Sequence, residues 1–256
     1  MPPSTPKTDW RAWLRRWDRQ QSGHVFDREE RYTAMLDTLE ALLPARFTVA
    51  DLGCGPGSMT QRLAKRFPKA HIIAIDFDPL LQRIGREAIG TQGGRIEWIE
   101  ADFRRPDWKR ALPVPRIDAA VSTTALHWLR RAPLRRLYRD LHGLLRSRGV
   151  FLNGDTFPEP ASHPLFRKVA ERVGHARARA GRTPGWEAWS EWWSAIEKDP
   201  TLSDLVQERR SRFPSHHPRE ENLDIEEHRS ALVRAGFREV GVLWQEFDNR
   251  VLFAAR

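Results

Sequence analysis

One nonapeptide, residues 49–57 with the sequence Val-Ala-Asp-Leu-Gly-Cys-Gly-Pro-Gly, limits the fold of this chain more than any other segment. A short apolar run ends at alternating glycines, and a helical pattern begins near Met59. A strand, a tight turn and a helix in this order form a nucleotide-binding crevice at the carboxyl end of a parallel strand. Gly53 and Gly55 matter because a side chain at either position would keep the backbone off a ligand or oppose a positive φ.

The details of this loop indicate which ligand it suits. A dinucleotide-binding loop has the pattern G-x-G-x-x-G, whereas here Ser58 stands at the last position and the third glycine is Gly57. Asp51 precedes the loop, where its charge would repel a pyrophosphate and attract a cation. We therefore expect a nucleoside that carries positive charge rather than a dinucleotide.

Strands and helices alternate along most of the chain, which predicts right-handed βαβ units and a parallel sheet. Near the carboxyl terminus, two alternating strands flank a turn at Asp248-Asn249, which predicts an antiparallel hairpin. The expected parallel strands are 47–52, 71–76, 95–101, 117–121 and 149–154; the helices are 59–67, 79–88, 106–111, 132–146 and 226–235; the hairpin strands are 239–245 and 249–255.

Four segments together resemble the class I S-adenosylmethionine-dependent methyltransferases. The glycine loop 51–57 resembles the first motif of that family, and residues 71–76 resemble its second strand, which ends in an acid. Residues 96–103 resemble the third strand with its terminal Asp-aromatic pair, and residues 117–128 the fourth strand with the loop that faces the methyl donor. The resemblance implies a Rossmann-like α/β fold, a seven-stranded sheet of five parallel strands plus the hairpin, with S-adenosylmethionine as cofactor.

The resemblance also implies residues for the methionine end of that cofactor. Asp51 is expected beside the methionine amino group, where a carboxylate offsets its charge. Gly53 and Gly55 would give backbone access, and Ser122 or Thr123 would line the pocket. As alternatives, Asp51 caps a helix and Ser122 is a satisfied turn residue.

A second set is implied for the adenosine end. Asp76 lies 23 residues after Gly53, close to the spacing at which an acid bonds ribose hydroxyls. Phe77 would pack on the adenine, Asp102 would accept its amino group, and the Phe103 backbone amide would bind a ring nitrogen. A helix cap is again the alternative for Asp102.

The remaining segments suggest additions to a single methyltransferase domain over residues 9–256. Residues 1–8 read as a disordered tail, and residues 9–44 as a cap of two helices, the first carrying an apolar tryptophan stripe. The proline-rich insertion 156–224 would be a helical lid, in which four tryptophans (186, 189, 192 and 193) follow helical spacing. They form either aromatic walls around an acceptor or the lid's own core.

Methyl transfer from a sulfonium is an in-line displacement that depends mainly on alignment and exclusion of water. His127 is the titratable candidate for a general base at this edge, with a role in packing or cofactor binding as the alternative. Trp128, Trp186 and Trp189 are expected to contact the acceptor. Arginines 15, 16, 19 and 104 are candidates to hold an anionic acceptor, or else solvated surface residues. With a single cysteine, Cys54, we expect no metal site.

These features favour a methyltransferase that acts on an oxygen or carboxylate of a small molecule. The formal net charge of +9 favours a tRNA or RNA methyltransferase as the alternative, although no appended RNA-binding module is visible. A non-catalytic cofactor-binding module is the third interpretation. We expect a cytoplasmic protein without a membrane partner, because no apolar stretch approaches about 20 residues and no secretory segment is visible. The sequence does not specify an oligomeric state.

Overall fold

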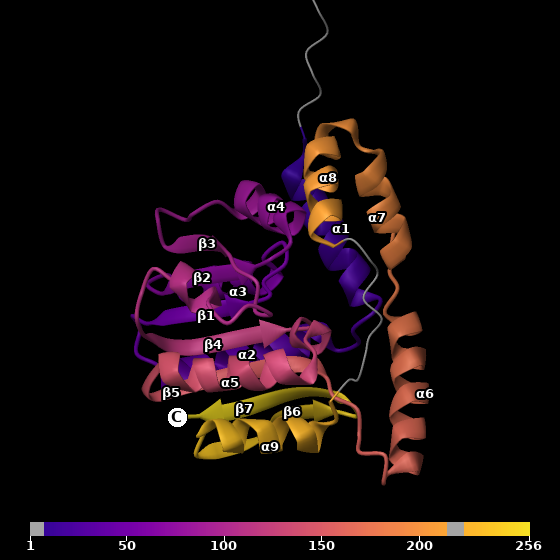
Figure 1. The fold of residues 1–256 in the computed structure, drawn as a ribbon. Helices are drawn as coiled ribbons and strands as arrows, with labels where there is room; N and C mark the ends of the chain where they lie inside the picture. Colours follow the sequence, from indigo (N-terminus) through magenta and orange to yellow (C-terminus); the bar gives the residue numbers. More distant parts are fainter. Residues whose placement is uncertain (1–7, 214–222) are drawn as a thin grey trace, which may run out of the picture.

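The computed structural model describes residues 8–213 and 223–256 and contains a seven-stranded mixed sheet (Figure 1). Its strand order is β3-β2-β1-β4-β5-β7-β6, with β1 to β5 parallel and β7 antiparallel to both of its neighbours. This confirms the predicted fold class. The strands are β1 (Thr48–Leu52), β2 (His71–Asp76), β3 (Ile96–Glu100), β4 (Ile117–Thr123), β5 (Leu145–Thr156), β6 (Glu239–Glu246) and β7 (Asn249–Ala255).

The sheet is covered on both faces, which explains why its central strands read as continuous apolar runs. Two buried clusters lie on its two sides: Met35, Met59 and Ile84 belong to one, Leu137 and Leu232 to the other. The first comes from α2 (Arg28–Leu42), α3 (Ser58–Arg66) and α4 (Pro79–Ile89). The second comes from α5 (Arg131–Leu144) and α9 (Ile225–Ala235), with the short helices η1 (Trp108–Ala111) and η2 (Leu126–Trp128) nearby in the chain.

The order of the strands fixes the position of the site. The chain runs outward from β1 to β2 and β3, and then returns to place β4 on the other side of β1. In open sheets of this kind, ligands bind beyond the carboxyl ends of the strands at such a reversal. The glycine loop, Ser122 and the loop after β4 therefore meet at one edge.

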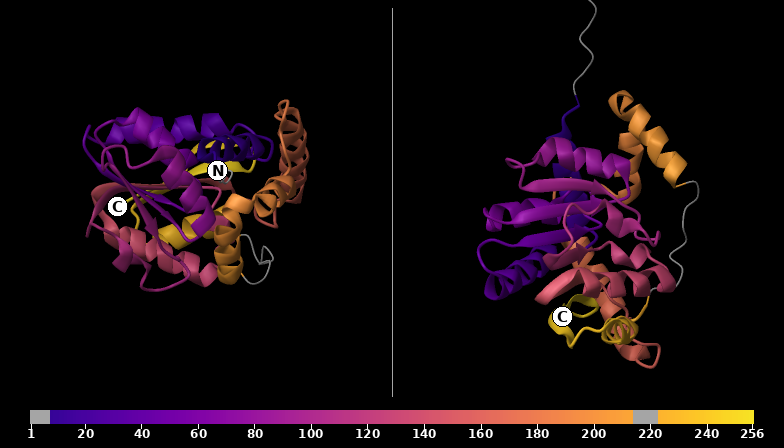
Figure 2. Two further views of the ribbon diagram at one scale, coloured as in Figure 1. Left: turned by 90° about the horizontal axis from the view of Figure 1, so that it is seen from above. Right: turned by 60° about the vertical axis from the view of Figure 1, so that its left-hand side comes forward.

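Helix α1 (Trp10–Ser22) and the helices of the insertion lie toward that edge, on the side to which the β4 arrow points (Figures 1 and 2). Asp9 caps α1 by accepting the backbone N–H of Ala12 at 2.9 Å. The rings of Trp13 and Trp17 pack edge-on against Trp192, with centroids 5.8 and 5.0 Å away. The insertion helices are α6 (Pro164–Ala180), α7 (Trp189–Lys198), η3 (Pro200–Leu202) and α8 (Ser203–Arg212).

Several local predictions need correction. Trp186 does not belong to the tryptophan helix, because α7 begins at Trp189 and the indole of Trp186 instead donates to the Gln20 carbonyl at 3.0 Å. The hairpin turn consists of Phe247 and Asp248, since β7 already begins at Asn249. Of the predicted tail 1–8, residues 1–7 lie outside the described residues, as do residues 214–222 of the insertion.

Trp192 belongs to α7 and is fully buried against α1, so we expect the substitution Trp192→Ala to destabilise the protein strongly. Removing a buried indole leaves a cavity and lowers the free energy of unfolding by about 3–5 kcal/mol. Denaturant unfolding followed by circular dichroism measures this change. Trp189→Ala is the matched control, because Trp189 is 40% exposed and should lose much less. Equal losses for both variants would contradict a tryptophan core between the two helices.

Candidate active site

The glycine loop is held against β2 by main-chain hydrogen bonds. The N–H groups of Gly53 and Cys54 both donate to the Ile75 carbonyl, at 2.8 and 3.0 Å. Gly53 has φ = 68°, and a Cβ built on it would lie 2.4 Å from the Cβ of Ala125, in the loop after β4. The positive φ agrees with the sequence analysis, and the absence of a side chain also lets the first and fourth strand loops approach each other.

The carboxylate of Asp51 is buried, and one of its two oxygens accepts no hydrogen bond. Its Oδ2 accepts the hydroxyl of Thr60 at 2.6 Å, whereas its Oδ1 is buried and has no hydrogen-bond partner. Burial raises the pKa of Asp51 to about 7, because the charged form is poorly solvated there. An unsatisfied acceptor of this kind suits a bound ammonium group, so the methionine end of S-adenosylmethionine fits the residues present.

Asp76 organises the loop as well as bordering the predicted ribose site. It accepts three backbone N–H groups, from Gly55 at 2.7 Å, Phe77 at 2.7 Å and Asp78 at 2.8 Å. Burial raises the pKa of Asp76 to about 6. A carboxylate offers about four lone-pair positions, so one acceptor position remains for a ligand hydroxyl. The ribose contact remains a prediction, now joined by a structural role that the sequence did not indicate.

At the predicted adenine end, Asp102 is engaged by a neighbouring cation. The Nε and Nη2 atoms of Arg104 donate to its two oxygens at 2.8 and 2.9 Å. The same guanidinium lies 4.8 Å from the ring centroid of Phe77, and Phe213 packs on that ring edge-on. Phe103 packs edge-on against Trp108. Adenine binding to Asp102 and Phe77 remains a prediction.

The two fourth-strand residues differ in their surroundings. Ser122 is buried within β4, where its hydroxyl donates to the Leu52 carbonyl at 2.8 Å. It is thus not a turn residue, and its hydroxyl hydrogen is already used inside the sheet. Thr123 is half-buried at the end of the same strand. Of the two, Thr123 is the better placed to line a pocket.

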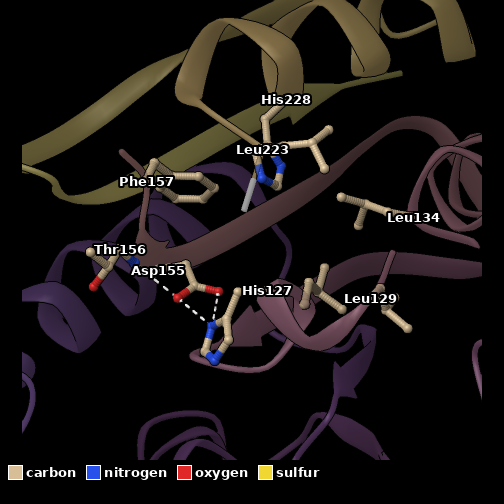
Figure 3. Close-up of a pocket in the computed structure, with 9 residues that line it drawn as sticks. His127, Leu129, Leu134, Asp155, Thr156, Phe157, Leu223 and His228 are labelled. Atoms are coloured by element: carbon tan, nitrogen blue, oxygen red, sulfur yellow. Dashed lines mark hydrogen bonds and ion pairs between the residues drawn. The ribbon is translucent and has the colours of Figure 1, made fainter. Parts of the chain in front are cut away.

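His127 forms a pair with Asp155, which the sequence analysis did not single out. The Nδ1 atom of His127 lies 2.9 and 3.0 Å from the two oxygens of Asp155, and its Nε2 points away from that carboxylate (Figure 3). Burial acts to raise the pKa of Asp155, but the charges of His127 and Arg31 outweigh it and hold that pKa below its ordinary value. Asp155 is therefore ionised and accepts a hydrogen bond from the Nδ1–H group of His127.

A small cavity adjoins this pair and contains a second histidine. Its wall includes Phe157, Leu223 and His228 along with the pair itself (Figure 3). Nδ1 of His228 lies 2.6 Å from the hydroxyl of Tyr138, and burial lowers the pKa of His228 to about 4. His228 is consequently neutral at physiological pH. It, too, was missed from the sequence, because its helix α9 begins about a hundred residues after His127.

The three tryptophans expected at the acceptor do not form one wall. Trp128 is 51% exposed and its ring lies 5.1 Å from that of His127. Trp189 packs on Trp17 of α1, and Trp186 is held by the Gln20 carbonyl. The structure thus brings Trp128 to the histidine and the other two to α1. Acceptor contact remains a prediction for all three.

Two structural absences concern residues 8–213 and 223–256, the part of the chain that the structure describes. Within those residues, no group of three or more His, Cys, Asp or Glu side chains could hold a metal ion. In the same part of the chain, no helix has the length and apolar character needed to cross a membrane.

Comparison with known proteins agrees with the geometry of this edge. Residues 49–149 match the family model described as a methyltransferase domain. The matched segment and the fold around it are both similar to those of class I S-adenosylmethionine-dependent methyltransferases. S-adenosylmethionine is the cofactor of that class.

Individual relatives narrow the comparison. The chain is 34% identical over 171 residues to a trans-aconitate 2-methyltransferase of Azoarcus sp., covering 64% of this chain and 62% of that protein. It is 29% identical over 217 residues to a trans-aconitate 2-methyltransferase of Escherichia coli, covering 72% of this chain and 81% of that protein. The structure of an O-methyltransferase family protein from Burkholderia thailandensis superposes with a TM-score of 0.55 at 19% identity, over 87% of this chain and 55% of that one. The chain thus spans less than two thirds of the Azoarcus relative.

Proposed function

We propose that this protein transfers a methyl group from S-adenosylmethionine to a carboxylate oxygen of a small organic acid. The observation that carries the proposal is the buried, unpartnered Oδ1 of Asp51 beside the glycine loop, which calls for a cationic ligand. The similarity to trans-aconitate 2-methyltransferases supports a carboxylic acid as acceptor. Asp51, Gly53, Gly55 and Asp76 would hold the cofactor.

The bound cofactor supplies a methyl group already activated by the positive sulfur. The protein therefore has to align acceptor and donor and exclude water. A carboxylate acceptor is ionised at neutral pH and needs no general base. His127, held by Asp155 through Nδ1, would serve instead to position the acceptor through an Nε2–H donor.

Calorimetric titration with S-adenosylmethionine, followed by transfer of a labelled methyl group, tests this function. We expect micromolar binding and a base-labile methyl ester when trans-aconitate is the acceptor. A simple phenol and bulk tRNA serve as competing acceptors. If either of these is labelled and no acid is methylated, the protein is a phenol or RNA methyltransferase and the proposal is wrong.

The pH profile separates the two roles of His127. If its imidazolium positions a carboxylate, kcat/KM falls as pH rises, because the neutral ring binds an anion less well. A general base would give the opposite slope. We expect the falling profile, measured with saturating cofactor, and its loss in His127→Gln. A rise in kcat/KM with pH would contradict the positioning role.

A further inference from the structure

Arg31 of α2 is a completely buried cation, and only one edge of its guanidinium forms a hydrogen bond. Its Nη1 donates to the Oδ1 of Asn249 at 3.0 Å, and Asn249 in turn donates to the Phe26 carbonyl at 2.6 Å. The guanidinium lies against Gly154 of β5, where a Cβ would be 3.2 Å from Nε and 3.0 Å from Cδ. The missing side chain at Gly154 thus provides the space that Arg31 occupies.

The opposite edge of this guanidinium has no partner. Both Nε and Nη2 of Arg31 are buried without a hydrogen bond. These two atoms form the fork that binds a carboxylate with two parallel hydrogen bonds. Two other arginines show this fork filled by a carboxylate: Arg16 binds Glu187 in this way at 2.8 and 2.7 Å, and Arg104 binds Asp102.

The fork lies at the edge that carries the proposed chemistry. Gly154 directly precedes Asp155, which holds His127, and Asn249 pairs with Thr156 at the end of β5. The charge of Asp155 acts on Arg31 without a hydrogen bond between them. A buried cation with an empty fork is unfavourable unless an anion completes it. Arg16 and Arg104, which the sequence suggested for this purpose, already have carboxylate partners.

We infer that the Nε and Nη2 fork of Arg31 binds a carboxylate of the acceptor, separate from the carboxylate that is methylated. The inference rests on the proposed function and narrows its substrate class to acids with at least two carboxylates. His127 positions the reacting carboxylate, and Arg31 holds the other. Arg31 is then a specificity-determining residue.

Steady-state kinetics with trans-aconitate and with the monocarboxylate crotonate test this assignment in Arg31→Gln, Arg31→Lys and wild type. We expect Arg31→Gln to raise KM for trans-aconitate about 10- to 100-fold, as for the loss of a charge-assisted pair. Crotonate, which has no second carboxylate, should be a poor substrate whose kcat/KM is the same in wild type and variant, and the calorimetric affinity for S-adenosylmethionine should stay unchanged. Arg31→Lys should restore part of the trans-aconitate KM. Arg139→Gln, at an exposed position of α5, removes the same charge and is the matched control.

A second variant tests the inference independently, in case Arg31→Gln does not fold. Gly154→Ala keeps the charge but displaces the guanidinium, and should raise KM for trans-aconitate selectively. An equal change for both acids, together with a shifted pH profile, would mean that Arg31 acts through Asp155 and would overturn the inference. So would an unchanged trans-aconitate KM in Arg31→Gln. If the wild type methylates no acid at all, the proposed function fails first, which is a distinguishable result.

Discussion

The substitution Asp51→Asn is expected to lower the affinity for S-adenosylmethionine about 100-fold, because it removes the charge that we propose to face the methionine amino group. The Oδ1 of Asp51 is buried and unpartnered, so no described donor competes with the ammonium group for that oxygen. Titration calorimetry at pH 8 measures the loss. Affinity within a few-fold of wild type would place the cofactor's amino group elsewhere.

The same substitution should make the free protein more stable. The folded-state pKa of Asp51, about 7, lies above its ordinary value of 3.8, so the folded form retains a proton that the unfolded chain releases. Wild-type stability therefore falls as pH rises from about 4 to 7 and then levels off. The neutral amide of the variant Asp51→Asn avoids this loss, but its buried N–H group has no partner and offsets part of the gain. We expect a net rise of about 1–2 kcal/mol in the free energy of unfolding at pH 8.

Thermal unfolding at pH 5 and pH 8 checks the sign of this effect. The gap between Asp51→Asn and wild type should widen at the higher pH and narrow when S-adenosylmethionine is added to wild type. Asp37→Asn, at an exposed acid paired with Arg66, is the control and should show no such gap. A variant less stable than wild type at pH 8 would contradict a strained, unpaired carboxylate.

Asp155→Asn should lower kcat/KM about 100-fold while leaving the affinity for S-adenosylmethionine near wild type. The ionised Asp155 fixes the Nδ1–H of His127 and partly balances the buried charge of Arg31. An amide keeps the shape but loses both interactions, so the acceptor is misaligned.

Asp118→Asn provides the matched control, because Asp118 lies on β4 and binds Thr48 N–H and Arg146 rather than any residue of the site. Its kcat/KM should equal that of wild type. Unchanged turnover in Asp155→Asn would show that the His127–Asp155 pair stabilises the loop only. Parallel loss of cofactor affinity would instead move the pair into the cofactor pocket.

Some site residues can be identified from a local sequence pattern, whereas others depend on contacts between distant parts of the chain. Asp51 and Asp76 end apolar strands beside glycine-rich or turn-forming residues, so a local pattern indicated both. Asp155 also ends an apolar strand, and the same argument could have found it. Its pairing with His127 could not be predicted, because β5 must first align beside β4. Arg31 depends on contacts that span the whole chain, since its partner Asn249 is 218 positions away.

The insertion illustrates a different limit. Helical spacing alone placed Trp186 with Trp189, Trp192 and Trp193, but the helix begins only four positions after Gly185, at Trp189. Gly185 has φ = 76°, which the helical conformation excludes. Which tryptophan becomes core was decided by α1, whose Trp13 and Trp17 enclose Trp192.

The sequence by itself determined the alternation of strands and helices, the glycine loop and the acids at the carboxyl ends of β1 and β2. These features follow from hydrophobic periodicity and glycine conformation, which act over a few residues. Only the tertiary structure decided that Asp155 holds His127, that Arg104 covers Asp102 and that Arg31 keeps an empty fork. Those arrangements depend on burial and on charges brought together by strand order, and neither is encoded within a short segment of the chain.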